Sequence, residues 1–320
     1  MGTAGKDGQE MDSAPDKSVK SVLNKKNISI LITDSGLGGI SICADVVSRL
    51  HRQPLFEDAA ITYFNAWPEQ NRGYNKFDTI TERVRIFNQA LVIMESYHPD
   101  LIMIACNTLS ALYDRTEFSR HSGIPVLGII DFGVDLIHEN LIKTPDSKAL
   151  ILGTLTMIAE NRHKEILIEK GIDNDRIITQ ACDGLPTAIE RNSEGEAVNE
   201  LTDKYIREAA QKIGQHRGKL FVALCCTHFG YSAPIIAQKA KQYVTDCVAI
   251  LNPNGLMSEF LFEQGSDDVC YKTNLDIKVI SKIEMDDVKI RSVSRLIHDV
   301  SPETAEALAN YEHKPDLFVF

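Results

Sequence analysis

The sequence predicts an α/β fold built on parallel sheets, and two observations lead to this prediction. Short apolar segments rich in β-branched residues alternate with segments whose apolar residues recur every three or four positions, as in amphipathic helices. The short segments are uniformly apolar, which is typical of strands covered by helices on both faces. The expected strands are 28–33, 59–64, 100–108, 124–130, 148–154 and 219–228, and the expected helices include 78–98, 201–215 and one through Ile40, Ala44, Val47 and Leu50.

The N-terminal segment differs in character from the rest of the chain. Residues 1–27 are polar and charged and contain several glycines and serines, so they offer little apolar surface to offset the entropy lost on ordering. We therefore expect a disordered leader over 1–27 and an ordered chain that begins with the apolar strand at Ile28. A chain of 320 residues is long enough for two domains or one large one.

The composition excludes several classes of protein. With 43% hydrophobic and 25% charged residues the chain falls in the normal range for globular proteins, and its net charge of −11 argues against a nucleic-acid-binding surface. It contains neither an apolar stretch of about 18 residues, which a membrane span needs, nor the apolar core of a signal peptide. We therefore expect a cytoplasmic protein that binds neither nucleic acid nor membrane.

The seven cysteines predict reduced thiols and no disulfide framework. Their number is odd, no two have the CxxC spacing, and no Cys and His residues have the spacing of zinc ligands. We therefore expect no bound metal, and each cysteine taken alone is expected to be a small buried hydrophobic residue.

A glycine-rich turn, DSGLGG at 34–39, follows the first expected strand and leads into a helix. Backbone N–H groups at such a turn attract an anion, and the helix dipole adds to the attraction. The alternative is a structural turn in which Asp34 or Ser35 caps the helix. The spacing matches neither glycine pattern that binds dinucleotides or nucleotide phosphates, and the lysine of the phosphate loop is missing, so a nucleotide-binding enzyme is not favoured.

Two expected strands end alike, in ACNT (105–108) and in CCTH (225–228). Open α/β sheets bind ligands beyond the carboxyl ends of their strands, so two such halves that face each other would place both motifs in one cleft. A thiol flanked by amide, hydroxyl and imidazole groups is suited to proton transfer, although a buried structural cysteine explains either motif alone. Adjacent strand residues point to opposite faces, so only one of Cys225 and Cys226 can face the cleft.

Taken in this order, the motifs resemble those of the glutamate racemases, within the wider aspartate/glutamate racemase superfamily. The resemblance also includes IPVLGII (124–130) and ACDGLPTAIE (181–190) and extends from about Ile28 to the C-terminus. It implies an isomerase of two pseudosymmetric α/β lobes, one formed by 28–132 with 252–320 and the other by 133–251, with the active site in the cleft between them. It further implies that neither pyridoxal phosphate nor a metal is needed, that the chain forms a homodimer, and that it supplies D-glutamate for the bacterial cell wall.

The resemblance also implies a role for each motif residue. Cys106 and Cys226 correspond to two bases that exchange a proton with opposite faces of the substrate α-carbon, and the CTH motif selects Cys226 over Cys225. Asp34 corresponds to the acid beside the first cysteine, and His228 to the histidine beside the second. The positions that correspond to substrate ligands are Ser35, Asn107, Thr108 and Thr227.

Two segments depart from the family pattern at the side-chain end of the substrate. Glutamate racemases usually have Pro-Tyr-Gly where this chain has Asn71, Arg72 and Gly73, a segment that helps to hold the side-chain carboxylate. Arg72 either pairs with that carboxylate or is a solvated surface residue. Thr154 lies in a segment that resembles the family's threonine-containing loop, but Met157 stands where a second threonine is expected. We expect Arg72, Gly73 and Thr154 to contact the substrate.

These departures leave the choice of substrate open. The leading hypothesis is a racemase of glutamate, and the alternatives are a racemase of aspartate or another acidic amino acid, or a catalytically idle relative that binds an acidic metabolite or a protein partner. Retention of both cysteines, Asp34 and His228 argues against the idle relative. A small acidic amino acid is therefore the expected ligand.

Overall fold

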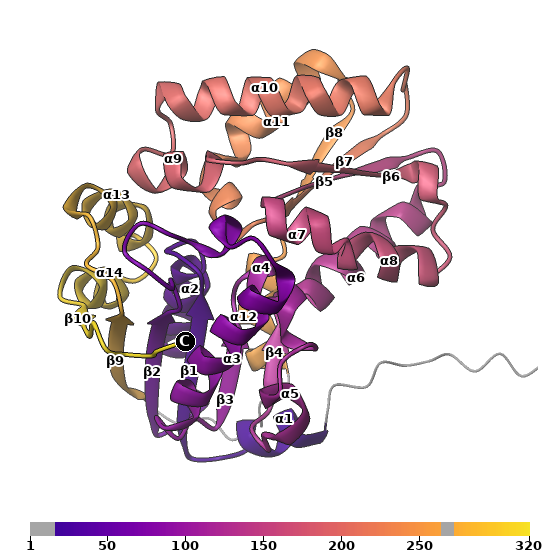
Figure 1. Ribbon diagram of the computed structural model, residues 1–320. Coiled ribbons are helices and arrows are strands. Elements are labelled where there is room, and N and C mark those ends of the chain that lie inside the picture. Colours follow the sequence, from indigo (N-terminus) through magenta and orange to yellow (C-terminus); the bar gives the residue numbers. More distant parts are fainter. Residues whose placement is uncertain (1–16, 264–271) are drawn as a thin grey trace, which may run out of the picture.

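All strand pairings in the described part of the chain are parallel, as the alternation of strands and helices predicts. The computed structural model describes residues 17–263 and 272–320 and arranges their strands in two sheets (Figure 1). The first sheet has the order β10-β9-β2-β1-β3-β4, and the second has the order β6-β5-β7-β8. The predicted α/β fold, with parallel sheets flanked by helices, is therefore confirmed.

The two sheets come from different parts of the sequence. The first contains β1 (Asn27–Asp34), β2 (Asp58–Asn65), β3 (Leu101–Ile104), β4 (Val126–Gly128), β9 (Asn274–Ser281) and β10 (Glu312–His313). The second contains β5 (Lys148–Gly153), β6 (Ile177–Ala181), β7 (Leu220–Cys225) and β8 (Val248–Leu251). The chain therefore leaves the first sheet after β4 and returns to it with β9.

Helices cover both sheets (Figure 1). Around the first lie α2 (Ile40–Arg52), α3 (Ile80–Glu95), α4 (Asn107–Tyr113), α5 (Phe118–His121), α12 (Asn254–Glu263), α13 (Asp287–His298), α14 (Pro302–Ala309) and the short η1 (Tyr74–Lys76). Around the second lie α6 (Ile129–Lys143), α7 (Leu155–Glu160), α8 (Arg162–Glu169), α9 (Leu185–Arg191), α10 (Glu196–Ile213), α11 (Ala233–Tyr243), η2 (Asn174–Arg176) and η3 (Thr227–Ser232). The lobe boundaries expected near residues 132 and 252 remain a prediction.

The cores follow from the alternation of side chains along the strands. In β1, Ile30 and Ile32 belong to one apolar cluster, whereas Leu31 belongs to a second cluster. In β5, Leu150 belongs to a third cluster and Ile151 to a fourth. Each sheet therefore buries both of its faces, which is why its strands are apolar at consecutive positions.

The strands predicted at the two cysteine motifs, 100–108 and 219–228, are too long. β3 and β7 end before each motif is complete, and α4 and η3 begin at Asn107 and Thr227. The reason is that a small or polar residue at the end of an apolar run fits a strand end and a helix start equally well. Both cysteines therefore stand at a junction between strand and helix.

The prediction of a disordered leader over 1–27 is wrong for its second half. Lys17–Leu23 form helix α1, and β1 begins at Asn27. Val19, Val22 and Leu23 are buried in the cluster on one face of the first sheet. Their spacing of three and four residues is an apolar helical stripe, which the polar average over the whole segment conceals. Residues 1–16 lie outside the described residues.

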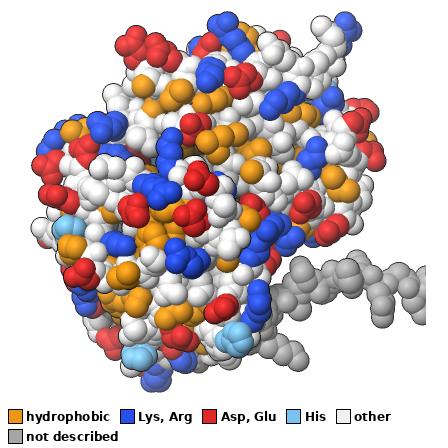
Figure 2. Space-filling view, in the orientation of Figure 1, with side chains coloured by type: hydrophobic (Ala, Val, Ile, Leu, Met, Phe, Trp, Pro, Cys, Tyr) orange, Lys and Arg blue, Asp and Glu red, His pale blue; other side chains and the backbone are white. Residues whose placement is uncertain are grey.

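The surface of the protein is mixed in charge. Figure 2 shows acidic and basic side chains interspersed over one face, with small hydrophobic patches among them. No helix within 17–263 or 272–320 combines the length and the apolarity needed to cross a bilayer.

Candidate active site

A cavity of about 560 Å³ lies where the carboxyl ends of the two sheets face each other. Asp34 at the end of β1 and Cys106 just after β3 border it from the first sheet. Thr154 after β5 and Cys226 after β7 border it from the second. Parallel strands present their carboxyl ends at one edge, so residues far apart in the sequence meet in this cavity.

The cavity brings together almost all of the residues expected from the sequence. Those that border it are Asp34, Ser35, Gly73, Cys106, Asn107, Thr108, Thr154, Cys226, Thr227 and His228. Arg72 is not among the residues that border it.

The two cysteines occupy equivalent positions in their lobes. Cys106 is the residue before the first turn of α4, and Cys226 is the residue before η3. Both have extended backbones, with φ and ψ of −151° and 117° at Cys106 and −147° and 128° at Cys226. Their side chains are 5% and 6% exposed. Cys225, the neighbour of Cys226, is fully buried in the apolar cluster on the other face of the second sheet.

Cys106 lies beside a hydroxyl and a carboxylate. Its Sγ is 3.2 Å from Ser35 Oγ. The Asp34 carboxylate accepts hydrogen bonds from the backbone N–H of Ser35 and of Gly39, both at 2.6 Å, and from Thr227 Oγ1 at 3.1 Å. Burial, followed by the charge of Asp34, raises the pKa of the Cys106 thiol well above its ordinary value. In the free protein this thiol is therefore protonated.

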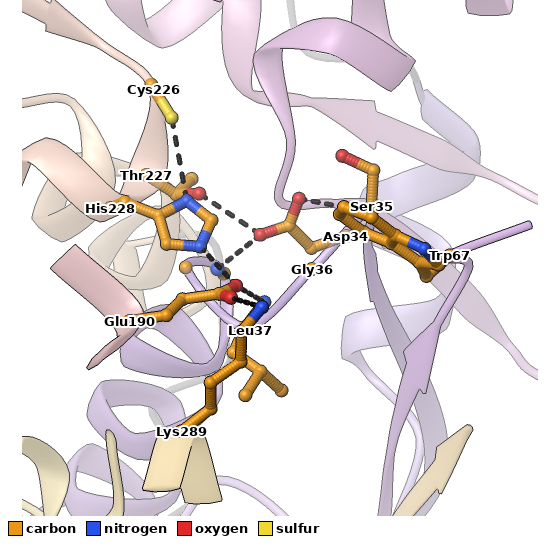
Figure 3. Close-up of polar contacts among 12 residues, drawn as sticks. Asp34, Ser35, Gly36, Leu37, Trp67, Glu190, Cys226, Thr227, His228 and Lys289 are labelled. Atoms are coloured by element: carbon orange, nitrogen blue, oxygen red, sulfur yellow. Dashed lines mark hydrogen bonds and ion pairs between the residues drawn. The ribbon is translucent and has the colours of Figure 1, made fainter. Parts of the chain in front are cut away.

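Cys226 begins a chain of polar contacts that Figure 3 shows. Its Sγ is 3.5 Å from His228 Nδ1, and His228 Nε2 is 2.8 Å from Glu190 Oε1. The backbone N–H of Leu37 donates to the same oxygen at 3.1 Å, and Lys289 Nζ pairs with Glu190 Oε2 at 2.5 Å. We call Cys226, His228, Glu190 and Lys289 the Cys226 cluster.

The Cys226 cluster contains a buried ion pair. Burial by itself lowers the pKa of His228, but hydrogen bonds to Cys226 and Glu190 outweigh it and raise this pKa well above its ordinary value. Burial likewise raises the pKa of Glu190, but the hydrogen bond and charge of His228, together with Lys289, outweigh it and lower this pKa to about 2. At neutral pH an imidazolium therefore stands beside Cys226, and a carboxylate holds its far nitrogen.

The glycine-rich turn brings the two halves of the site into contact. A side chain at Gly38 would begin 2.4 Å from His228 Nδ1 and 2.4 Å from Thr227 Oγ1. Only glycine therefore allows the turn after β1 to approach the CTH motif of the other sheet this closely.

Further polar groups that border the cavity suit a substrate. Asn107 is 2% exposed, and within the described residues neither polar atom of its amide has a hydrogen-bond partner. The hydroxyls of Thr108 and Thr154, which come from different sheets, are 2.7 Å apart. The hydroxyl of the buried Tyr74, which also borders the cavity, has no partner among the described residues. Groups of this kind are available to hold a polar ligand.

Arg72 and Met157 take structural positions away from the cavity. The Arg72 guanidinium lies over the Phe77 ring, 3.9 Å from its centroid, and its Nη1 is 3.9 Å from Glu69 Oε2. The guanidinium of Arg72 is therefore held outside the cavity, contrary to the expected contact with the substrate. Met157 is 1% exposed and packs against Gly153, so its apolar side chain fills space beneath the threonine loop.

Sequence reasoning missed four residues of this site, namely Glu190, Asn75, Lys289 and Tyr74 described above. Glu190 is the last residue of the matched segment 181–190, so its position in that segment was an available signal. Asn75 Oδ1 accepts hydrogen bonds from Thr156 N and Thr156 Oγ1, at 3.1 and 2.7 Å, and so links the two lobes beside the cavity. Lys289 had no motif to mark it. Within the described residues no three His, Cys, Asp or Glu side chains are grouped as metal ligands.

The family of the chain follows from a match over this region. The profile of the family described as Asp/Glu/Hydantoin racemase matches residues 74–252, more than half of the chain. The chain belongs to the Asp/Glu/Hydantoin racemase family. The matched residues include Cys106 and Cys226, and the prediction of an enzyme of the isomerase class is confirmed.

Individual members of the racemase family resemble the chain over most of its length. The glutamate racemase of Campylobacter jejuni is 26% identical over 260 residues, which cover 80% of this chain and 94% of that protein. The glutamate racemase of Aquifex pyrophilus is 26% identical over 246 residues, which cover 76% of this chain and 87% of that protein. The predicted resemblance to glutamate racemases is therefore confirmed.

Solved structures share the fold. The crystal structure of the Campylobacter jejuni glutamate racemase has a TM-score of 0.60 at 23% identity and covers 85% of this chain and 97% of that one. The glutamate racemase from Francisella tularensis, in complex with D-glutamate, has a TM-score of 0.63 at 21% identity and covers 85% and 94%. At this identity the likeness concerns the arrangement of the two sheets.

Proposed function

We propose that the protein interconverts L- and D-glutamate without a cofactor, by proton transfer between Cys106 and Cys226. One observation carries the proposal: both thiols border the same cavity, Cys106 beside the Asp34 carboxylate and Cys226 beside the His228 imidazole. The glutamate racemases among its relatives support the choice of substrate.

The reaction requires two bases on opposite faces of the α-carbon. One cysteine, as the thiolate, takes the α-proton and becomes a thiol, and the electron pair of the broken C–H bond is delocalised into the α-carboxylate. The opposing thiol then donates its proton to the other face and becomes the thiolate. The product is the mirror image of the substrate, and the same two steps in reverse regenerate it. A single base would return the proton to the face from which it came.

Asp34 and His228 prepare the two thiols for these steps. The negative charge of Asp34 favours the thiol form of Cys106, whereas the His228 imidazolium lies 3.5 Å from the sulfur of Cys226. Each group is also placed to pass a proton to or from its cysteine between turnovers. The cavity therefore contains a proton donor, the Cys106 thiol, before substrate enters.

Neutral donors hold the substrate in this proposal. The amide of Asn107 and the hydroxyls of Ser35, Thr108 and Thr227 are suited to the α-carboxylate and the ammonium group. Preorganised donors of this kind also stabilise the negative charge that develops next to the α-carboxylate. Tyr74 and Thr154 are available for the side-chain carboxylate, in place of the family residues that this chain lacks.

A proton NMR time course in deuterated buffer tests the proposal. L-glutamate and L-aspartate are each incubated with the protein and a thiol reductant, without pyridoxal phosphate, and optical rotation is followed in parallel. Loss of the glutamate α-proton signal together with loss of rotation is the expected result, and Cys247→Ser, which replaces an exposed thiol, is the matched control that keeps the activity. Exchange of aspartate alone would overturn the assignment of glutamate. An unchanged α-proton in both would overturn racemisation.

A further inference from the structure

Two adjacent ion pairs join α9 of the second lobe to the start of α13 in the C-terminal part of the chain. Glu190 pairs with Lys289 at 2.5 Å, and Arg191 Nη2 pairs with Asp286 Oδ2 at 2.9 Å. All four residues border the cavity. The two pairs differ in burial, since the Glu190 and Lys289 side chains are 5% and 20% exposed, whereas those of Arg191 and Asp286 are 56% and 36% exposed.

Lys289 reaches the reacting thiol through two intermediate side chains. Its ammonium binds Glu190 Oε2, while the other oxygen of the same carboxylate binds His228, whose Nδ1 faces Cys226. Figure 3 shows this line of contacts running from the C-terminal segment to the sulfur. The ring of Trp67 flanks the ammonium, with its centroid 5.9 Å from Lys289 Nζ.

We propose that Lys289 is a positioning residue for the proton transfer at Cys226, acting through Glu190 and His228. This inference rests on the proposed racemase function. By holding one carboxylate oxygen, Lys289 fixes the rotamer of Glu190 and leaves the other oxygen aimed at His228. Without Lys289, Oε2 of this buried carboxylate would lose its ion pair while Oε1 kept His228 and the Leu37 N–H, so its negative charge would be only partly compensated.

The electrostatic effect of Lys289 has a definite sign. Removing a positive charge near a titratable group favours the protonated form of that group, so it moves the titration to higher pH. The titratable or charged groups that face Glu190 are His228 and Tyr231 from η3 and Lys289 from α13. Lys289 is the member of this set that faces Glu190 from the C-terminal segment.

The test compares Lys289→Met, Lys289→Arg and Arg191→Met in the full-length protein. For Lys289→Met we expect kcat to fall by about tenfold, with a smaller change in KM, and the acid limb of the kcat–pH profile to move up by about one pH unit. Lys289→Arg keeps the positive charge, so we expect the acid limb of its kcat–pH profile to stay at the wild-type position. Arg191→Met breaks the neighbouring ion pair and leaves Lys289 with Glu190, so its profile should keep the wild-type limb.

A second readout does not depend on turnover. The rate at which iodoacetamide alkylates Cys226, read by peptide mass spectrometry as a function of pH, should move to higher pH in Lys289→Met but not in Lys289→Arg or Arg191→Met. An equal change in Lys289→Met and Arg191→Met would mean that Lys289 only ties two helices together, and that outcome overturns the inference. An unchanged profile in Lys289→Met also overturns it. A wild-type protein that racemises neither acid refutes the proposed function, whereas the alkylation profiles still decide the role of Lys289.

Discussion

Glu190→Gln removes a buried charge from the middle of the Cys226 cluster, and the structure sets the size of the effect. The pKa of Glu190 falls from 4.5 to about 2, because His228 and Lys289 together outweigh the effect of burial. A carboxyl group with a lowered pKa stabilises the fold above its unfolded pKa, and this contribution is lost as the pH falls through the folded value. A fall of about 2.5 units corresponds to about 3 kcal/mol of unfolding free energy. The raised pKa of His228 reflects the same ion pair with Glu190, so it adds no separate contribution to the unfolding free energy.

Urea unfolding followed by circular dichroism measures this contribution. At pH 6, where Glu190 is ionised in both states and His228 is mostly protonated in both, we expect Glu190→Gln to be less stable than wild type by about 3 kcal/mol. At pH 3 the gap should shrink to about 1 kcal/mol, since the unfolded carboxyl is by then protonated. Glu194→Gln, which replaces an exposed carboxylate nearby, should differ from wild type by less than about 0.5 kcal/mol. A difference in unfolding free energy between wild type and Glu190→Gln that is below about 1 kcal/mol at pH 6, or that is equal at pH 6 and pH 3, would refute the reasoning.

Three further predictions concern the thiols, the contact between lobes and the N-terminal helix. Cys106→Ser and Cys226→Ser should each lower kcat for racemisation by about 10³-fold without changing the far-ultraviolet circular dichroism, since serine is nearly isosteric but far less acidic; full activity in either would contradict the two-base reaction. Thr108→Val and Thr154→Val each leave one hydroxyl of a pair 2.7 Å apart without its partner, so each should raise KM about fivefold. The double variant should raise KM by less than the product of the two single effects. Leu23→Ala should lower the unfolding free energy by about 3 kcal/mol in urea titrations, because this side chain is 1% exposed, and no loss would show that α1 contributes nothing to the core.

The fold class was predictable because both of its signals are local. The apolar strands and amphipathic helices can be read in windows of ten to twenty residues, and they determine parallel sheets covered on both faces. The C-terminal strand β9 is harder to recognise, since its burial alternates over Asn274–Lys278 and becomes continuous only from Val279. Helix α1 was missed for a related reason, because three apolar side chains at helical spacing are diluted by the polar residues around them.

The candidate site was predictable to the extent that its residues lie at strand ends. Asp34, Cys106 and Cys226 each follow an apolar run, and the topology brings the carboxyl ends of those runs to one cavity. The position of Arg72 was not predictable, because a single sequence does not show whether a guanidinium turns toward a cavity or stacks on a ring. Phe77, five residues later on the same loop, provides that ring.

The two cysteine motifs look alike in the sequence, yet the structure surrounds the two thiols with opposite charges. Cys106 faces the carboxylate of Asp34, which is held by two backbone N–H groups and a hydroxyl. Cys226 faces an imidazolium that is backed by Glu190 and Lys289. Lys289 lies 99 residues beyond Glu190 in the chain, so no local pattern connects the two. In the proposed reaction one cysteine takes a proton from the substrate and the other gives one, and the unequal surroundings of the two sulfurs distinguish them before substrate enters the cavity.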